Sequence, residues 1–259
     1  MTIKPKVKRV KSLQLKKYRQ QEQCFVVEGR KGVEALLHSD YEVELVAATV
    51  AYMESTSKLL KSLKKNLHEG LFEADEEDLS RMGSFQNNDA MLAVARMKKE
   101  ADPITAKGLV LVLDEIRDPG NMGTMIRTAD WFGITQIVAS PGCVDFYNPK
   151  VISATMGSFC NVNFCCRELS GFLKNIKSPV YGAFLNGNPL ESIHFDPNAV
   201  IVIGNESAGI SDSVASVIQN RIKIEGKGHA ESLNASVAAG ILLYAASIAQ
   251  SSKVHNHSF

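Results

Sequence analysis

The sequence predicts an α/β protein made of two parts. Residues 109–259 alternate short strands with helices, and several strands are almost entirely apolar, as expected where helices cover both faces of a parallel sheet. Residues 1–97 show a second, smaller alternation of helix-like and strand-like segments, which predicts a small α/β domain. Residues 98–108 are polar and include Pro103 and Gly108, so they predict a linker.

The elements of the first part follow from the spacing of apolar residues. Acidic residues at 75–78 also favour a helix start, where carboxylates complement the helix dipole. In order, we expect a basic helix over 12–23, a strand over 25–27, a helix over 29–38, a strand over 43–49, an amphipathic helix over 59–67, a strand over 71–74, a helix from 75 and a strand over 90–96.

The second part is predicted in the same way. Strands are expected over 109–113, 136–139, 180–184, 199–203 and 221–224, and helices over 121–132, 149–156, 210–218 and 231–249. In parallel sheets of this kind, ligands bind in the loops beyond the carboxyl ends of the strands. Three polar, glycine-containing motifs sit in such loops, so we expect the functional site there.

Composition excludes several classes of protein. The chain has 259 residues, of which 45% are hydrophobic and 22% charged, values ordinary for a soluble globular protein. Its five cysteines show no CxxC spacing, so neither a disulfide framework nor a zinc site is predicted. Free thiols point to a reducing, cytoplasmic location. No apolar run reaches the roughly 20 residues of a membrane span, and we expect no membrane contact and no metal.

The net charge of +1 gives no general argument for nucleic acid, but the first twenty residues hold eight basic residues and no acidic one. Such a basic arm suits a phosphate backbone, because each neutralised phosphate releases counterions. A solvated terminus is the alternative. The basic residues that we predict to contact RNA are Lys8, Arg9, Lys11, Lys16, Lys17, Arg19 and Arg30.

Three motifs carry the functional prediction. The first runs from Asn121 to Ala129 as Asn-Met-Gly-Thr-Met-Ile-Arg-Thr-Ala, the second from Ile203 to Gly209 as Ile-Gly-Asn-Glu-Ser-Ala-Gly, and the third from Ile224 through a Gly-rich turn to Ser-Leu-Asn at 232–234. Together and in this order they closely resemble the motifs of the SpoU/TrmH family of RNA ribose 2′-O-methyltransferases, in the SPOUT class. The resemblance covers roughly residues 109–249.

The resemblance implies a fold and an assembly. The C-terminal part would be a trefoil-knotted SPOUT methyltransferase domain with a parallel sheet; without the resemblance, the general absence of knots would predict an open sheet. The N-terminal part, including residues 17–19 and 25–30, looks like a ribosomal-protein-like RNA substrate-binding domain. The family also implies a homodimer through the C-terminal domain, in which Arg127 of one chain reaches the donor pocket of the other.

The resemblance also implies site residues, with S-adenosyl-L-methionine as methyl donor and no metal. The catalytic set would be Arg127, Asn121, Glu206, Ser232 and Asn234. The cofactor would be held by Leu185, Asn186, Gly187, Gly204, Asn205, Gly209, Ile224, Leu233 and Asn234. Two roles for Arg127 remain open, because a guanidinium does not deprotonate: it stabilises the incipient alkoxide or it clamps an RNA phosphate.

Other chemistries find no support. The chain has no GxGxxG after its first parallel strand and no complete P-loop motif. The predicted function is therefore S-adenosylmethionine-dependent 2′-O-methylation of structured RNA. Ribosomal RNA of the 23S type is favoured, since minimal tRNA-modifying relatives often lack an N-terminal domain. The alternatives are a tRNA 2′-O-methyltransferase and a non-catalytic RNA-binding factor. Glu225 departs from the proline common in the family, which puts the shape of that loop in doubt.

Overall fold

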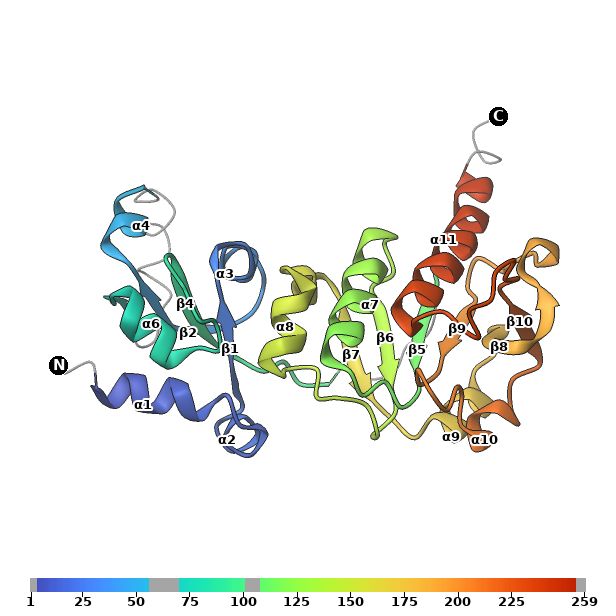
Figure 1. The fold of residues 1–259 in the computed structure, drawn as a ribbon, viewed down its shortest axis with the longest axis horizontal. Coiled ribbons are helices and arrows are strands. Elements are labelled where there is room, and N and C mark those ends of the chain that lie inside the picture. The colour runs from blue at the N-terminus through green and yellow to red at the C-terminus, as the bar shows by residue number, and fades with distance from the viewer. Residues whose placement is uncertain (1–3, 56–69, 101–107, 255–259) are drawn as a thin grey trace. The chain divides into compact units, whose positions relative to one another are not determined.

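The computed structural model describes residues 4–55, 70–100 and 108–254, and these fold into two compact units (Figure 1). Unit 1 comprises residues 1–99 together with Asp145–Cys160. Unit 2 comprises Glu100–Val144 and Asn161–Phe259. Residues 145–160, which lie within the predicted second part of the sequence, group by their contacts with unit 1.

Unit 1 is built on a four-stranded sheet with the order β1-β4-β2-β3. The pairs β1–β4 and β4–β2 are antiparallel, and β2–β3 is parallel. Its strands are β1 (Cys24–Glu28), β2 (Val43–Ala48), β3 (Gly70–Glu73) and β4 (Met91–Arg96). Its described helices are α1 (Lys4–Ser12), α2 (Lys16–Glu22), α3 (Arg30–Leu37), α4 (Val50–Ser55), α6 (Glu76–Met82) and α8 (Pro149–Thr155).

One expectation for unit 1 changes. The helix expected over 12–23 is shorter, because Leu15 is extended and α2 begins only at Lys16; a separate helix, α1, precedes it and ends at Ser12. Helix α6 begins as predicted after Asp75, whose carboxylate accepts a hydrogen bond from the Asp78 N–H at 2.7 Å. The amphipathic helix expected over 59–67 lies outside the described residues.

The segment Asp145–Cys160 completes the core of unit 1. Tyr147 and Phe159 pack on Phe25 of β1, with ring centroids 4.6 and 5.8 Å away. Gly157, with φ +101°, passes so close to α3 that a side chain there would lie 2.7 Å from the Cβ of Ala35. The central part of the sequence is thus structurally part of the N-terminal unit.

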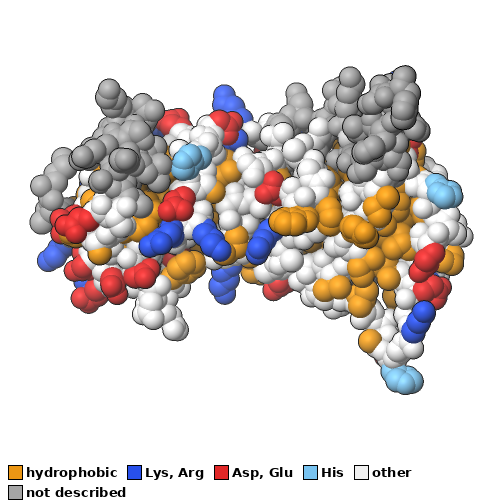
Figure 2. Space-filling model, turned by 90° about the horizontal axis from the view of Figure 1, so that it is seen from above, with side chains coloured by type: hydrophobic (Ala, Val, Ile, Leu, Met, Phe, Trp, Pro, Cys, Tyr) orange, Lys and Arg blue, Asp and Glu red, His pale blue; other side chains and the backbone are white. Residues whose placement is uncertain are grey.

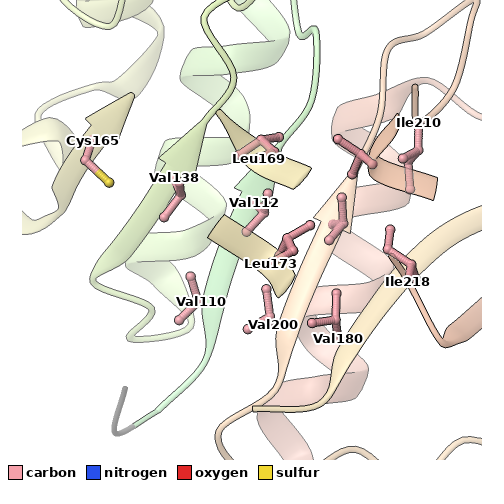
Figure 3. Packing of buried hydrophobic residues seen from close by; sticks show 12 residues of the cluster. Val110, Val112, Val138, Cys165, Leu169, Leu173, Val180, Val200, Ile210 and Ile218 are labelled. Carbon is pink, nitrogen blue, oxygen red and sulfur yellow. The ribbon is translucent and has the colours of Figure 1, made fainter. Parts of the chain in front are cut away.

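Unit 2 contains a six-stranded sheet with the order β10-β8-β9-β5-β6-β7, in which every pair is parallel. Its strands are β5 (Val110–Leu113), β6 (Gln136–Ala139), β7 (Asn163–Cys166), β8 (Val180–Pro189), β9 (Val200–Ile203) and β10 (Asn220–Lys223). Apolar side chains of one sheet face pack against α9 (Leu169–Asn175) and the segment around α10 (Asp212–Ala215) (Figure 3). The parallel α/β prediction is confirmed, although β7 and α9 were not predicted and β8 is longer than expected.

Helices α7 (Pro119–Trp131) and α11 (Ala235–Val254) pack against each other, and α11 also contacts β9. Helix α7 starts as the sequence suggests: Asp118 caps it by accepting from the Asn121 N–H at 2.7 Å, and Pro119 follows. Helix α11 begins at Ala235, later than the predicted residue 231, because Asn234 takes the capping position. Among the described helices, none has the length and apolarity needed to cross a membrane.

Candidate functional site

Strand order brings the predicted site residues to one edge of the unit 2 sheet. Strands β10, β8, β9 and β5 are neighbours and run in parallel, so their carboxyl ends share that edge. Asn121 follows β5, residues 204–209 follow β9, and Ile224 follows β10. Residues 185–187 lie in the outer, exposed half of β8. Four chain segments that are distant in sequence therefore meet where a parallel sheet binds ligands.

A chain of hydrogen bonds joins the three motifs. Asn234 Nδ2 donates to Asn121 Oδ1 at 3.0 Å, and Asn121 Nδ2 donates to Glu206 Oε1 at 2.6 Å. At the other end, Asn234 Oδ1 accepts from the Ser236 N–H of α11 at 2.8 Å. In this series of hydrogen bonds, each group donates to the next one in the direction of Glu206. The amide orientations of both asparagines are thereby fixed by a helix N-terminus on one side and a carboxylate on the other.

Asn205, which was predicted to bind the cofactor, uses its side chain inside the protein. Its Oδ1 accepts from the Ser207 and Ala208 N–H groups at 2.9 and 3.0 Å. Its Nδ2 donates to the Glu115 carbonyl at 2.9 Å and to Glu206 Oε2 at 3.2 Å. Two acceptor positions and two donors are the full capacity of an amide. A side-chain hydrogen bond from Asn205 to a cofactor is therefore not supported.

The predicted glycines are needed for backbone contacts within the protein. A methyl group on Gly204 would lie 2.3 Å from the backbone of Gly209 and Ile210, and one on Gly187 would lie 2.7 Å from the Arg221 carbonyl oxygen. Gly209 has φ +70°, a conformation that favours glycine. Gly204 and Gly209 close the Asn205–Gly209 loop, while Gly187 lets β8 pass close to β10.

Arg127 and Ser232 lie outside the hydrogen-bonded chain. Both side chains are exposed, and neither makes a hydrogen bond or ion pair with another residue of the described ranges. Arg127 is six residues beyond Asn121 on α7, so at 3.6 residues per turn the two side chains are about 120° apart around the helix axis. The structure therefore brings together Asn121, Glu206 and Asn234, and leaves Arg127 exposed.

The remaining predicted cofactor residues are exposed or half-buried. Leu185 and Leu233 keep 75% and 46% of their surface exposed, unusual for leucine, and Ile224 is half-buried. The turn between β10 and Asn234 is open, since a side chain built on Gly226 or Gly228 would meet nothing within 4 Å. Asn186 is exposed on the same segment as Leu185.

The predicted RNA contacts divide into two groups. Lys8, Lys11, Lys16, Lys17 and Arg30 are exposed on unit 1 and can reach a phosphate backbone. The other two are engaged internally. Arg9 pairs with Glu22 and Glu44 at 2.8 and 2.7 Å, and Arg19 is 1% exposed.

Arg19 corrects the prediction for the basic arm. Its guanidinium donates to the carbonyls of Leu13 and Gln14 at 3.0 and 2.8 Å and pairs with Asp145 at 2.5 Å. Removing the partner of such a buried charge is strongly destabilising, so Arg19 is committed to contacts inside unit 1. No local pattern could indicate this pairing, because Asp145 lies 126 positions further along the chain.

The cysteines and the acidic residues of the described ranges are the alternative candidates for reactive or metal-binding groups. All five cysteines are free thiols. Burial raises the pKa of the Cys24 thiol to about 12 and that of the Cys165 thiol to about 11, which disfavours the reactive thiolate. Within the described ranges, no group of three or more His, Cys, Asp or Glu side chains could hold a metal ion.

The parallel sheet, the three motif loops at its edge and the linked asparagines define the class of a methyltransferase of the SpoU type. Residues 108–244 match the family described as the SpoU rRNA Methylase family, so the chain belongs to that family. Residues 4–93 match the domain described as the MRM3-like substrate binding domain.

Individual proteins of known name agree with this assignment. The chain is 31% identical, over 92% of its length and 94% of the relative's, to the 23S rRNA (guanosine(2553)-2′-O)-methyltransferase RlmP of Bacillus subtilis strain 168. A TrmH-family protein from Porphyromonas gingivalis shares 33% identity and superposes with a TM-score of 0.83, covering 95% of this chain and 98% of that one. An AdoMet-bound rRNA methyltransferase from Sinorhizobium meliloti shares 25% identity with a TM-score of 0.82, covering 95% of each chain.

Proposed function

We propose that this protein transfers a methyl group from S-adenosylmethionine to a ribose 2′-hydroxyl of ribosomal RNA of the 23S type. The observation that carries the proposal is the hydrogen-bonded chain from Asn234 through Asn121 to Glu206, which joins all three family motifs at one sheet edge. The relatives' names add the substrate class, since RlmP acts on 23S rRNA. The match of residues 4–93 to a substrate-binding domain favours rRNA over tRNA.

The residues divide the work of an in-line displacement. S-adenosylmethionine, when bound, supplies an electrophilic methyl group on a sulfonium. Leu185, Ile224 and Leu233 would hold it by apolar contact and through backbone groups of their loops, with Asn186 beside them. Ser232 and Asn234 would complete the pocket at the start of α11. Alignment of donor and acceptor is the larger part of what such a site must supply.

Asn121 and Glu206 would orient the ribose, because their side chains are already fixed against each other. Arg127 would act at the acceptor oxygen, either by stabilising the developing negative charge or by clamping the adjacent phosphate. Its exposure and its freedom from ion pairs with the described residues support a role towards a partner molecule.

Two finer features of the fold belong to the proposal. Strand β10 is an outermost strand of the sheet, and β5 is the third strand from it in the order β10-β8-β9-β5. After β10 the chain nevertheless returns to β5, because Asn234 contacts Asn121, which follows β5. This long return across neighbouring loops supports a trefoil knot in unit 2. The four-stranded mixed sheet of unit 1, with helices packed on it, supports a ribosomal-protein-like RNA-binding domain.

A homodimer through unit 2 is also part of the proposal. Four exposed apolar residues of α11, Val237, Ile241, Tyr244 and Ile248, follow helical spacing on one side of the helix, and Trp131 of the adjacent α7 is 84% exposed. Figure 2 shows hydrophobic side chains gathered over part of this unit. A contiguous apolar face of this kind is typical of a protein–protein interface. Its position beside α7 supports a shared site, to which Arg127 of the partner subunit would contribute.

Mapping ribose methylation by mass spectrometry in a deletion strain tests the function. We expect one 2′-O-methyl mark to disappear from 23S-type rRNA and to return when the wild-type gene is restored. Loss of a tRNA mark alone would establish the tRNA alternative. If no mark is lost from either RNA and calorimetry detects no binding of S-adenosylmethionine to the folded protein, the non-catalytic RNA-binding factor replaces the enzyme.

A mixing experiment tests the shared site. Arg127→Ala and Asn234→Ala proteins should each be inactive, and mixing them should form heterodimers with one intact site and part of the wild-type activity. Native mass spectrometry of isotope-labelled and unlabelled chains establishes that chains exchange. Exchange without recovered activity would place Arg127 and Asn234 of one site on the same chain.

A further inference from the structure

The loop that carries Glu206 is held by Asn205, a residue with no proposed direct contact to the reacting groups. Asn205 and Gly209 pair through both backbone groups, with N–O distances of 2.9 and 3.0 Å, so the loop is a closed turn. Inside that turn, Asn205 Oδ1 accepts from two successive N–H groups. The Asn205 side chain is therefore fixed by the loop before it touches Glu206.

The amide nitrogen of Asn205 makes the functional contacts. It donates to Glu206 Oε2 at 3.2 Å, while Asn121 donates to Oε1 of the same carboxylate at 2.6 Å. Two donors on the two oxygens fix the plane of the carboxylate as well as its position. Charge-assisted hydrogen bonds of this kind are stronger and more directional than neutral ones.

The same nitrogen ties the loop to the opposite side of the site. It donates to the carbonyl of Glu115, which follows β5 and has φ +57°, a left-handed conformation that is uncommon for a residue other than glycine. Such a conformation is energetically unfavourable and persists only where its surroundings hold it. The Glu115 N–H donates to Ser140 Oγ at 2.9 Å, so hydrogen bonds connect the loops that follow β5, β6 and β9.

We infer that Asn205 is a positioning residue, which acts through Glu206 by clamping one carboxylate oxygen while Asn121 clamps the other. This inference rests on the proposed function and adds a residue to its machinery. Because the amide has no capacity left for a ligand, Asn205 sets the orientation of Glu206 and makes no side-chain hydrogen bond to the methyl donor.

The variant Asn205→Asp separates the clamp from the turn. Aspartate keeps Oδ1, which closes the turn, but it lacks both N–H donors and places a second carboxylate beside Glu206. We expect kcat on unmodified rRNA to fall about a hundredfold, the order expected when a reacting group is misplaced by about 1 Å. The dissociation constant of S-adenosylmethionine, measured by calorimetry, should stay within about twofold of the wild-type value, since apolar and backbone contacts hold the donor.

Asn220→Asp is the matched control. Asn220 also donates its amide to a backbone carbonyl of unit 2, that of Val180 at 3.0 Å, and it lies at the opposite end of β10 from the site. The same chemical change there should alter kcat by less than about twofold, because loss of one amide–carbonyl hydrogen bond costs stability and leaves the site intact.

A double-mutant cycle with Glu206→Ala decides between the clamp and a general structural effect. If Asn205 acts through Glu206, Asn205→Asp should lower kcat by less than about twofold once Glu206 is gone, because coupled residues are not additive. A full hundredfold loss in the Glu206→Ala background would overturn the inference. So would a large loss of S-adenosylmethionine affinity with kcat unchanged, which would make Asn205 a cofactor ligand.

The clamp can also be judged without turnover. Thermal unfolding of the same four proteins should show coupling, with Asn205→Asp lowering Tm less in the Glu206→Ala background than in the wild type. Equal shifts in both backgrounds would overturn the inference even if the wild-type protein methylates no RNA. An inactive wild-type protein with coupled Tm shifts would instead refute the proposed function and leave the Asn205–Glu206 clamp established.

Discussion

Replacing Asp145 by alanine removes the carboxylate that pairs with the buried guanidinium of Arg19. Only 2% of the Arg19 side chain is exposed, and two of its nitrogens donate to the same Asp145 oxygen at 2.5 and 3.2 Å. Removing one partner of a buried ion pair costs about 3–5 kcal/mol, because the other charge stays buried without compensation. The Asp145 side chain is 19% exposed, so water can partly replace it, and we expect about 3 kcal/mol.

This loss is a large part of the free energy of unfolding of a typical domain, about 5–15 kcal/mol. Hydrogen–deuterium exchange of the full-length protein measures it locally, through the protection of amides in β1 and β4. Glu42→Ala is the matched control, since Glu42 pairs with Arg96 at 3.1 Å while both side chains are about half exposed; such pairs contribute about 0–1 kcal/mol. If Asp145→Ala loses no more protection than Glu42→Ala, the assignment of Arg19 to the fold of unit 1 is wrong.

Three further predictions concern the site and the RNA surface. Arg127→Ala should lower kcat about a hundredfold with S-adenosylmethionine affinity and Tm unchanged, because the exposed side chain acts at the acceptor; near-normal turnover would refute that role. Gly204→Ala should lower Tm and abolish S-adenosylmethionine binding, because the added methyl group would lie 2.3 Å from backbone atoms. Gly226→Ala is the control: its methyl group would meet nothing within 4 Å, so this variant should keep the wild-type Tm. Replacing the exposed Lys16 and Lys17 by alanine should weaken RNA binding and reduce the slope of log affinity against log salt by about 0.7–0.9 per lost phosphate contact. An unchanged slope would mean that neither lysine contacts an RNA phosphate and that both are simply solvated surface residues.

Local patterns predicted the elements that position the site. The strand Val200–Ile203 is fully buried, and its unbroken apolar sequence identified a central parallel strand. The start of α7 was recognisable within two residues from its polar, glycine-containing beginning. In contrast, β7 is an outermost strand of only four residues, Asn163–Cys166, and only one of them is buried. Four residues are too few for an alternation of apolar and polar side chains to be recognised.

What the sequence could not show depends on contacts between distant residues. Arg19 has the surroundings of an exposed basic arm, and only the folded chain reveals the carboxylate that buries it. The side chain of Asn205 bonds to Glu115, 90 positions away, so its role as a clamp was hidden behind its place in a cofactor motif. The segment Asp145–Cys160 was assigned to the second domain because sequence order is the default guide to domain membership, and here tertiary packing overrides it.

The placement of Asp145–Cys160 in unit 1 has a consequence for biosynthesis. Domains of a growing chain generally fold from the N-terminus as soon as their residues have left the ribosome. Unit 1 lacks the partner of Arg19 and two of its core aromatic rings until residues 145–160 have emerged. Its closure therefore waits until β5 and β6 of unit 2 have been synthesised, which raises the contact order of unit 1 above that set by its own strand pairs.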